Sequence, residues 1–315
     1  MAGFTSTSPD FLVRGEVWSS QLKDVLMDEL VAQKYITWLT EFPDGDTFTI
    51  PTISGQMQVD NYEEDTSIQY HAMDTGEFQF QITEYLSSAT YITNKQKQDT
   101  FYMSQLVSSF VPAQHRAIMA RLETSILGLS ANQTASNLNT INGAAHRFVA
   151  SGTNEAMSVV DFARALHSLK KANVPQTNLV AIVDPSVEYT LNTLTNLVNV
   201  SNNPKWEGIV STGIASGMRF IKNVYGFDVY TSNYLADANE TISGLTTAAD
   251  KANMFFSAAQ GVGPFIGAWR QMPKVDTEYN KDYQREEYVT TARFGVDLYR
   301  PENLVVVLSD TDVVA

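Results

Sequence analysis

The spacing of apolar residues changes several times along the chain, and each change predicts a different element. Apolar residues at helical spacing predict an amphipathic helix over residues 19–34. A second helical stripe predicts one long helix over about 98–129. Pro112 lies within that stripe, and we expect the helix to kink there or to begin anew, because proline cannot donate the helical hydrogen bond.

Between these two helices the apolar residues alternate with polar ones. Phe48 and Ile50, and later Ile68 and Tyr70, follow the period of two that is typical of strands. We therefore predict a long two-stranded excursion, continued by a strand through Phe78 and Phe80. Its apolar positions are too sparse for a core of its own, so it should lean on another surface. Its tip is acidic, with carboxylates at Asp60, Glu63, Glu64 and Asp65.

The second half of the chain predicts an α/β region. After a polar, Asn-rich stretch over 131–156, which is typical of a loop, Ser158 and Asp161 form a capping box that begins a helix. The continuous apolar run NLVAIVDP predicts a strand buried on both faces. Asp184 and Pro185 then cap and open another helix.

Two further extended segments follow. NVYGFDVYTSNYL predicts a short buried strand that is positioned by a turn at Gly226 and ends in a polar Ser-Asn turn. QREEYVTTARFGVDLYRPENLVVVLSD predicts an unusually long strand. One face of that strand carries Tyr288, Thr290, Ala292, Phe294, Val296 and Leu298.

Composition narrows the class of protein. The chain has 315 residues, of which 43% are hydrophobic, so it can bury one large core or two interleaved ones. The formal net charge is −14, and no basic stripe is present to release counterions from phosphates, which argues against tight nucleic-acid binding. With no cysteine in the sequence, disulfides and thiolate chemistry are excluded. The sequence shows neither a secretion signal nor a membrane-spanning run, so we expect a protein that is made and stays in a cytoplasm.

A search for catalytic motifs favours a non-enzymatic protein. The four histidines do not have metal-ligand spacing, and GVGPFIG departs from the dinucleotide fingerprint and predicts a bent strand or a turn. Neither a nucleophile elbow nor a phosphate loop occurs. Adjacent acids such as Glu63 and Glu64 favour a solvated or partner-facing surface over an acid/base pair. We expect no metal and no cofactor.

Taken in order, these elements resemble the major capsid proteins of tailed double-stranded DNA phages, which have the Hong Kong 97-type α+β fold. The most specific pieces are GIASGMRFIKNVYGFDVYTSNYL and QREEYVTTARFGVDLYRPENLVVV. The resemblance covers nearly the whole chain and implies four regions. They are an N-terminal arm and helix (1–44), an extended loop (45–76), a peripheral domain (77–156 and 266–315) with a spine helix (98–129), and an axial α/β domain (157–265).

The resemblance implies a coat protein that self-assembles through hexamers and pentamers into an icosahedral shell around phage double-stranded DNA. Such a protein would be assembled in the host bacterial cytoplasm and become part of the virion. The N-terminal arm is too short to serve as a cleaved scaffold, so we expect a separate scaffolding protein, a portal protein and in some shells a cement protein. Residues 45–76 contain no Lys to cross-link subunits, so we expect a non-covalent shell.

By resemblance, the extended loop reaches over a neighbouring subunit. Its acidic tip would face basic groups there, and the candidates are Lys95, Lys97, Arg116 and Arg121. The alternating residues Phe48, Ile50, Ile68 and Tyr70 would supply apolar contact. If the tip is merely solvated, those apolar residues alone would hold the neighbour.

Two other functions stay open at this point. An encapsulin-like nanocompartment shell would have the same fold and differ in its contents. A cytoplasmic α/β enzyme would use the 157–235 region, and the absence of a recognisable catalytic constellation weighs against it.

Overall fold

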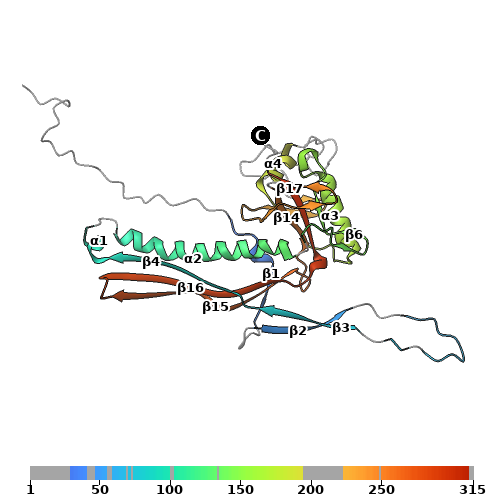
Figure 1. Cartoon of the computed structure of the whole chain (residues 1–315), viewed down its shortest axis with the longest axis horizontal. Coiled ribbons are helices and arrows are strands. Elements are labelled where there is room, and N and C mark those ends of the chain that lie inside the picture. The colour runs from blue at the N-terminus through green and yellow to red at the C-terminus, as the bar shows by residue number, and fades with distance from the viewer. Residues whose placement is uncertain are drawn as a thin grey trace, which may run out of the picture.

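The computed structural model describes residues 29–40, 47–54, 59–68, 70–71, 74–99, 103–132, 135–193, 223–247 and 250–311. Two larger sheets organise these residues (Figure 1). A long, narrow sheet runs beside the helix α2 (Met103–Gly128), and a second sheet lies with α3 and α4 beyond the C-terminal end of α2.

The long sheet has four strands in the order β1-β15-β16-β4. Its centre is the antiparallel pair β15 (Phe265–Asn280) and β16 (Arg285–Leu298). The edge strand β4 (Glu84–Thr93) pairs antiparallel with β16, whereas β1 (Ile36–Leu39) pairs parallel with β15. At 14 residues, β16 confirms the long strand predicted from the sequence.

Helix α2 packs on one face of this sheet. The buried Gln114 accepts a hydrogen bond from the Thr290 hydroxyl (2.8 Å) and donates one to the Tyr288 carbonyl (3.2 Å). Leu122 and Ile126 share an apolar core with Phe294 and Leu298 of β16.

Of the two outcomes expected at Pro112, a kink or a new helix, the new helix was wrong. Helix α2 runs continuously through this residue, and the short helix α1 (Asn94–Asp99) precedes it. Tertiary packing overrides the local signal, since α2 packs against β4 and β16 of the long sheet.

The second sheet has seven strands among the described residues, in the order β7-β17-β14-β8-β10-β9, with β11 also paired to β14. Parallel pairing joins β8 to β10 and β7 to β17, and β14 is antiparallel to both β8 and β17. The strands are β7 (Arg147–Val149), β8 (Leu179–Val183), β9 (Asn223–Val224), β10 (Phe227–Thr231), β11 (Asp237–Ala238), β14 (Asp250–Ser257) and β17 (Leu304–Asp310).

Several local predictions for this region are confirmed. Helix α3 (Val159–Lys171) begins with the Ser158–Asp161 capping box, and all five residues of β8 are buried. Helix α4 (Pro185–Thr193) begins where predicted, with the Asp184 carboxylate accepting the Ser186 N–H at 2.9 Å. The turn before β10 has positive φ at Gly226, as its sequence predicts.

Two predictions about extended regions were wrong. The stretch 131–156, predicted as a loop, contains the hairpin of β5 (Thr140–Ile141) and β6 (Ala144–Ala145) as well as the fully buried β7. The C-terminal run is not one strand, because a 3-10 turn η6 (Pro301–Asn303) separates β16 from β17. Strand β17 therefore joins the seven-stranded sheet and not the long sheet.

Among its described residues, the excursion forms a hairpin at its base and no strand beyond it. Strands β2 (Thr47–Ser54) and β3 (Asp74–Gln81) pair antiparallel, with Phe48 opposite Phe80 and Ile50 opposite Phe78. The strand predicted through Ile68 and Tyr70 was wrong, since the described residues between 59 and 71 form no strand. Alternation alone does not form a strand when no partner strand provides hydrogen bonds.

The predicted helix over 19–34 lies mostly outside the described residues. Of its final residues, only a 3-10 turn η1 (Ala32–Tyr35) is helical. The remaining small elements are η2 (Leu129–Asn132), η3 (Thr153–Glu155) and the hairpin of β12 (Thr241–Ile242) with β13 (Leu245–Thr246).

Candidate assembly surfaces

The described residues between 59 and 71, here called the tip loop, project away from both sheets (Figure 1). Four large side chains of the tip loop lie open to solvent. Their exposed fractions are 94% for Val59, 73% for Tyr62, 66% for Ile68 and 93% for Tyr70. Isolated exposed apolar residues are ordinary, but four within one projecting segment mark a surface that a partner can cover.

The acidic residues of the tip loop are exposed as predicted. Asp60, Glu63, Glu64 and Asp65 all lie at the surface, and Asp65 has a positive φ of 66°. A turn closes where the Thr66 N–H donates to the Glu63 carbonyl at 3.3 Å. One local partner was not predicted: the His71 Nε2 lies 2.5 Å from the Asp60 carboxylate and partly offsets the negative charge when the ring is protonated.

The basic candidates do not meet the acidic tip within one chain. Lys95 and Lys97 lie on α1, at the opposite end of the molecule from the tip loop (Figure 1). Lys97 pairs instead with Glu286 of β16 at 2.5 Å, and Arg121 lies 3.9 Å from Glu84 of β4. Any contact between the tip loop and Lys95 or Lys97 therefore requires two subunits.

Phe48 and Ile50 lie in a different environment from Ile68 and Tyr70. They are half-buried, and they pack with Phe78 around a small cluster formed by Phe80, Ile82, Ile266 and Ala268 of the same chain. The base of the hairpin is thus fixed to the body by its own apolar contacts, and the tip loop is not.

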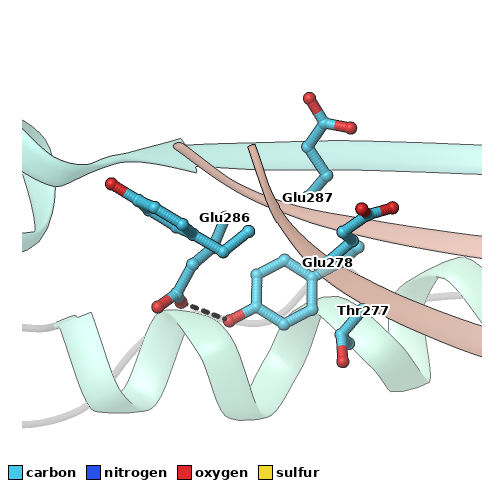
Figure 2. Close-up of a pocket in the computed structure, with 6 residues that line it drawn as sticks. Thr277, Glu278, Glu286 and Glu287 are labelled. Carbon is cyan, nitrogen blue, oxygen red and sulfur yellow. Dashed lines mark hydrogen bonds between the residues drawn. The ribbon is translucent and has the colours of Figure 1, made fainter. Parts of the chain in front are cut away.

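A pocket of about 320 Å³ lies near the turn between β15 and β16 (Figure 2). Its lining was not predicted and comprises Thr277, Glu278, Tyr279, Glu286, Glu287 and Tyr288. Hydrogen bonds from Lys97 and Tyr288 lower the pKa of Glu286, and the bond from Arg285 (2.6 Å) lowers that of Glu287. Both carboxyl groups therefore favour the ionised form, which suits them to ionic contact.

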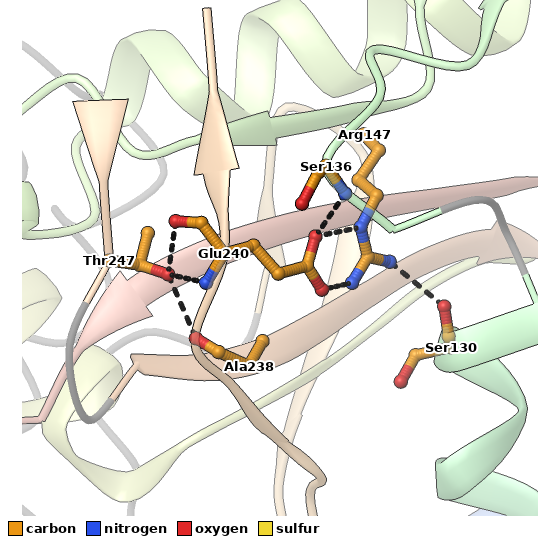
Figure 3. Close-up of polar contacts among 6 residues, drawn as sticks. All are labelled: Ser130, Ser136, Arg147, Ala238, Glu240 and Thr247. Atoms are coloured by element: carbon orange, nitrogen blue, oxygen red, sulfur yellow. Dashed lines mark hydrogen bonds and ion pairs between the residues drawn. The ribbon is translucent and has the colours of Figure 1, made fainter. Parts of the chain in front are cut away.

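A largely buried ion pair ties the seven-stranded sheet to the end of α2 (Figure 3). Arg147 of β7 donates two hydrogen bonds to Glu240 and a third, 2.8 Å long, to the Ser130 carbonyl in η2, just beyond α2. The Ser136 N–H also donates to Glu240, at 2.8 Å, and the arginine lowers the pKa of Glu240 against the effect of burial. Removing one partner would strand a buried charge, a change that typically costs about 3–5 kcal/mol.

A metal site and a membrane-spanning helix are both absent from the described residues. These residues contain no cluster of three or more His, Asp or Glu side chains arranged to hold a metal ion. Within the same residues, no helix has the length and apolar character that crossing a membrane requires.

Comparison with known proteins gives a consistent result. A family model described as phage capsid protein matches residues 77–307. No curated protein matches the sequence.

Solved structures share the fold over the whole chain at low sequence identity. The capsid of cyanophage Pam1 matches with a TM-score of 0.71 and 14% identity, covering 96% of this chain and 99% of that chain. A chain from mycobacterium phage Che8 has a TM-score of 0.68 and 16% identity, with coverages of 95% and 97%. The capsid of Ralstonia phage GP4 has a TM-score of 0.66 and 11% identity, and all of both chains is covered.

Proposed function

This chain belongs to the phage capsid protein family and is a major capsid protein with the Hong Kong 97-type fold, and we propose that its copies form an icosahedral shell of hexamers and pentamers around double-stranded DNA. Copies of the chain associate with one another, and the assembled protein belongs to the virion capsid. Its role in the capsid is structural, and we propose that it catalyses no reaction.

The observation that carries this proposal is the tip loop. It presents Val59, Tyr62, Ile68 and Tyr70 to solvent, at a distance from the core of its own chain. Burial of apolar area is the main favourable term in most protein association. A repeated subunit provides a covering surface for every copy of the loop, because each subunit both offers and receives the same contact.

We propose a division of the chain that follows the predicted regions with two changes. Residues 1–44 are the arm and 45–76 the extended loop, and α2 with β4, β15 and β16 forms the peripheral domain, to whose sheet the arm adds β1 at one edge. The axial domain extends beyond 157–265, because β7 and β17 pair within the seven-stranded sheet. The Arg147–Glu240 pair then lies where the peripheral and axial domains meet.

For the tip of the extended loop, we propose a neighbour that supplies cations. The candidates remain Lys95, Lys97, Arg116 and Arg121. Of these, Lys97 and Arg121 already lie beside carboxylates of their own chain and would contact the tip in addition. A separate scaffolding protein, a portal protein, a cement protein, a non-covalent shell and assembly in a bacterial cytoplasm remain predictions that rest on the family resemblance.

Electron microscopy tests the proposal directly. We expect the protein, expressed with its neighbouring genes, to form closed shells with hexameric and pentameric units, and shells from infected cells to hold nuclease-resistant DNA. Particles that hold a packaged protein instead would support a nanocompartment. Small, uniform oligomers under every condition, with scaffolding protein present, would contradict shell formation.

A further inference from the structure

Glu123 is a fully buried carboxylate on α2 that none of the surfaces above uses. Its two oxygens accept hydrogen bonds from three consecutive backbone N–H groups. The distances are 2.8 Å from Val31 N and 2.6 Å from Ala32 N to Oε1, and 3.3 Å from Gln33 N to Oε2. These groups lie at the start of η1, where the backbone offers no helical acceptor.

The three N–H groups belong to a segment that crosses α2 before joining the long sheet. We call residues 29–39, which contain η1 and β1, the strap. The Gln33 side chain adds a second polar contact, donating to the Met119 carbonyl at 2.8 Å, one helical turn from Glu123. Strand β1 then forms the parallel edge of the long sheet, and Trp38 stacks on Trp269 with ring centroids 5.4 Å apart.

Few charged groups compensate Glu123. Arg116 on the same helix favours its ionised form. On the strap, Lys34 pairs with Glu29 at the surface (3.0 Å), and on the β4 side Arg121 lies 3.9 Å from Glu84. Burial raises the pKa of Glu123, and the three N–H bonds and Arg116 only partly reverse that effect.

The cost of this burial indicates a specific role. Val31, Ala32 and Ile36 already pack against Leu122 and Ile126, so apolar contact alone could cover this part of α2. A buried charge is commonly no better for stability than a well-packed apolar side chain of similar volume. A carboxylate does fix position, however, because three N–H groups meet it in only one placement of the strap.

We propose that Glu123 is a lock that holds η1 of the strap on α2, and that its loss releases η1 while the seven-stranded sheet and strands β4, β15 and β16 stay folded. The lock is a property of the single subunit and does not depend on shell formation. If the proposed function holds, the lock also keeps the strap in the same position on α2 in every copy of the shell.

Limited trypsin digestion of dissociated subunits tests the lock, because Lys34 is exposed within the strap and the Lys34–Tyr35 bond is held in η1. Cleavage of a folded protein follows the population of locally opened molecules when opening is fast. We expect Glu123→Met to raise the rate at which fragments beginning at Tyr35 form, by tenfold or more. Methionine keeps the volume and removes both acceptor oxygens, so the three N–H groups of the docked strap lose their Glu123 acceptor, and the two from Val31 and Ala32 are buried.

Glu84→Gln is the matched control, since it removes a carboxylate beside α2 without touching the strap, and its cleavage rate should stay within twofold of wild type. Thermal melting of Glu123→Met should remain a single transition close to that of wild type. A wild-type cleavage rate in a folded Glu123→Met subunit would show that apolar packing holds the strap, and would overturn the proposal.

A second variant covers the case in which Glu123→Met does not fold. Glu123→Gln keeps the shape and one acceptor oxygen, and we expect faster cleavage at Lys34 with other sites protected as in wild type. Equal acceleration at all sites in Glu123→Gln would show that residue 123 supports the whole subunit, and would equally reject a lock.

Discussion

The seven-stranded sheet and the tip loop differ in where their apolar side chains find partners. In the sheet, Phe255 is fully buried, and its ring meets those of Phe162 and Phe227 edge to face at centroid distances of 5.1 and 5.3 Å. In the tip loop, Tyr70 is 93% exposed. The sheet thus completes its core within one chain, whereas the loop presents an apolar surface that only another molecule can cover. Stability of the subunit and stability of the shell should therefore depend on different residues.

The largest effect on the subunit is expected in the sheet. Phe255→Ala removes a ring from the centre of the core and should cost about 3–5 kcal/mol of unfolding free energy. Tyr62→Ala in the tip loop should change the same quantity by less than about 0.5 kcal/mol. Denaturant unfolding of dissociated subunits measures both. Equal losses would mean that the tip loop belongs to the folded core.

A smaller, pH-dependent effect is expected at the edge of the sheet. Burial lowers the pKa of His146 from its ordinary value, although its bond to the Ala144 carbonyl (3.1 Å) and the nearby Glu302 oppose the change. The folded state therefore favours the neutral ring. The neutral His146 ring contributes fully to the unfolding free energy above about pH 6.5. This contribution is lost as the pH falls, by at most about 1.4 kcal/mol per pH unit.

Unfolding of wild type and His146→Asn between pH 7.5 and 5.0 measures this contribution, since asparagine keeps a donor for the Ala144 carbonyl and does not titrate. We expect a shallower loss of stability in the variant. Parallel curves for the two proteins would show that His146 is ionised as readily in the folded state as in the unfolded one.

The smallest effect on the subunit is expected at the acidic tip. Reversing Glu63 and Glu64 to Lys should leave the unfolding free energy within about 1 kcal/mol of wild type, because both side chains are exposed. Shell yield should nevertheless fall, since a small term per contact is repeated in every copy. If the double variant assembles normally at low and high salt, the tip is merely solvated and apolar contacts alone hold the neighbour.

How far the sequence predicts the structure depends on the range of the interactions. The capping box of α3, the buried run of β8 and the turn at Gly226 are set by neighbouring residues, and all were predicted. The bonds of Glu123 to Val31 and of Arg147 to Glu240 join residues 92 and 93 positions apart, and no local pattern signals them.

The candidate contact residues show the same limit. The alternation through Phe48 and Ile50 is indistinguishable in sequence from that through Ile68 and Tyr70, yet only the first pair has a partner strand. Exposure of the tip loop could be predicted from its sparse apolar residues. The packing of Phe48 and Ile50 on their own chain could not be predicted, because it depends on β15 residues more than 200 positions away.

The central claim is that the tip loop serves the neighbouring subunit and not its own. Replacing residues 59–71 with a Gly-Ser segment of equal length tests this claim most directly, because it spares Phe48 and Ile50 at the base of the hairpin. We expect the variant subunit to unfold with the free energy of wild type to within about 1 kcal/mol, and electron microscopy of the same preparation to show no closed shells. Normal shells from this variant would contradict the claim, and so would a subunit that no longer folds.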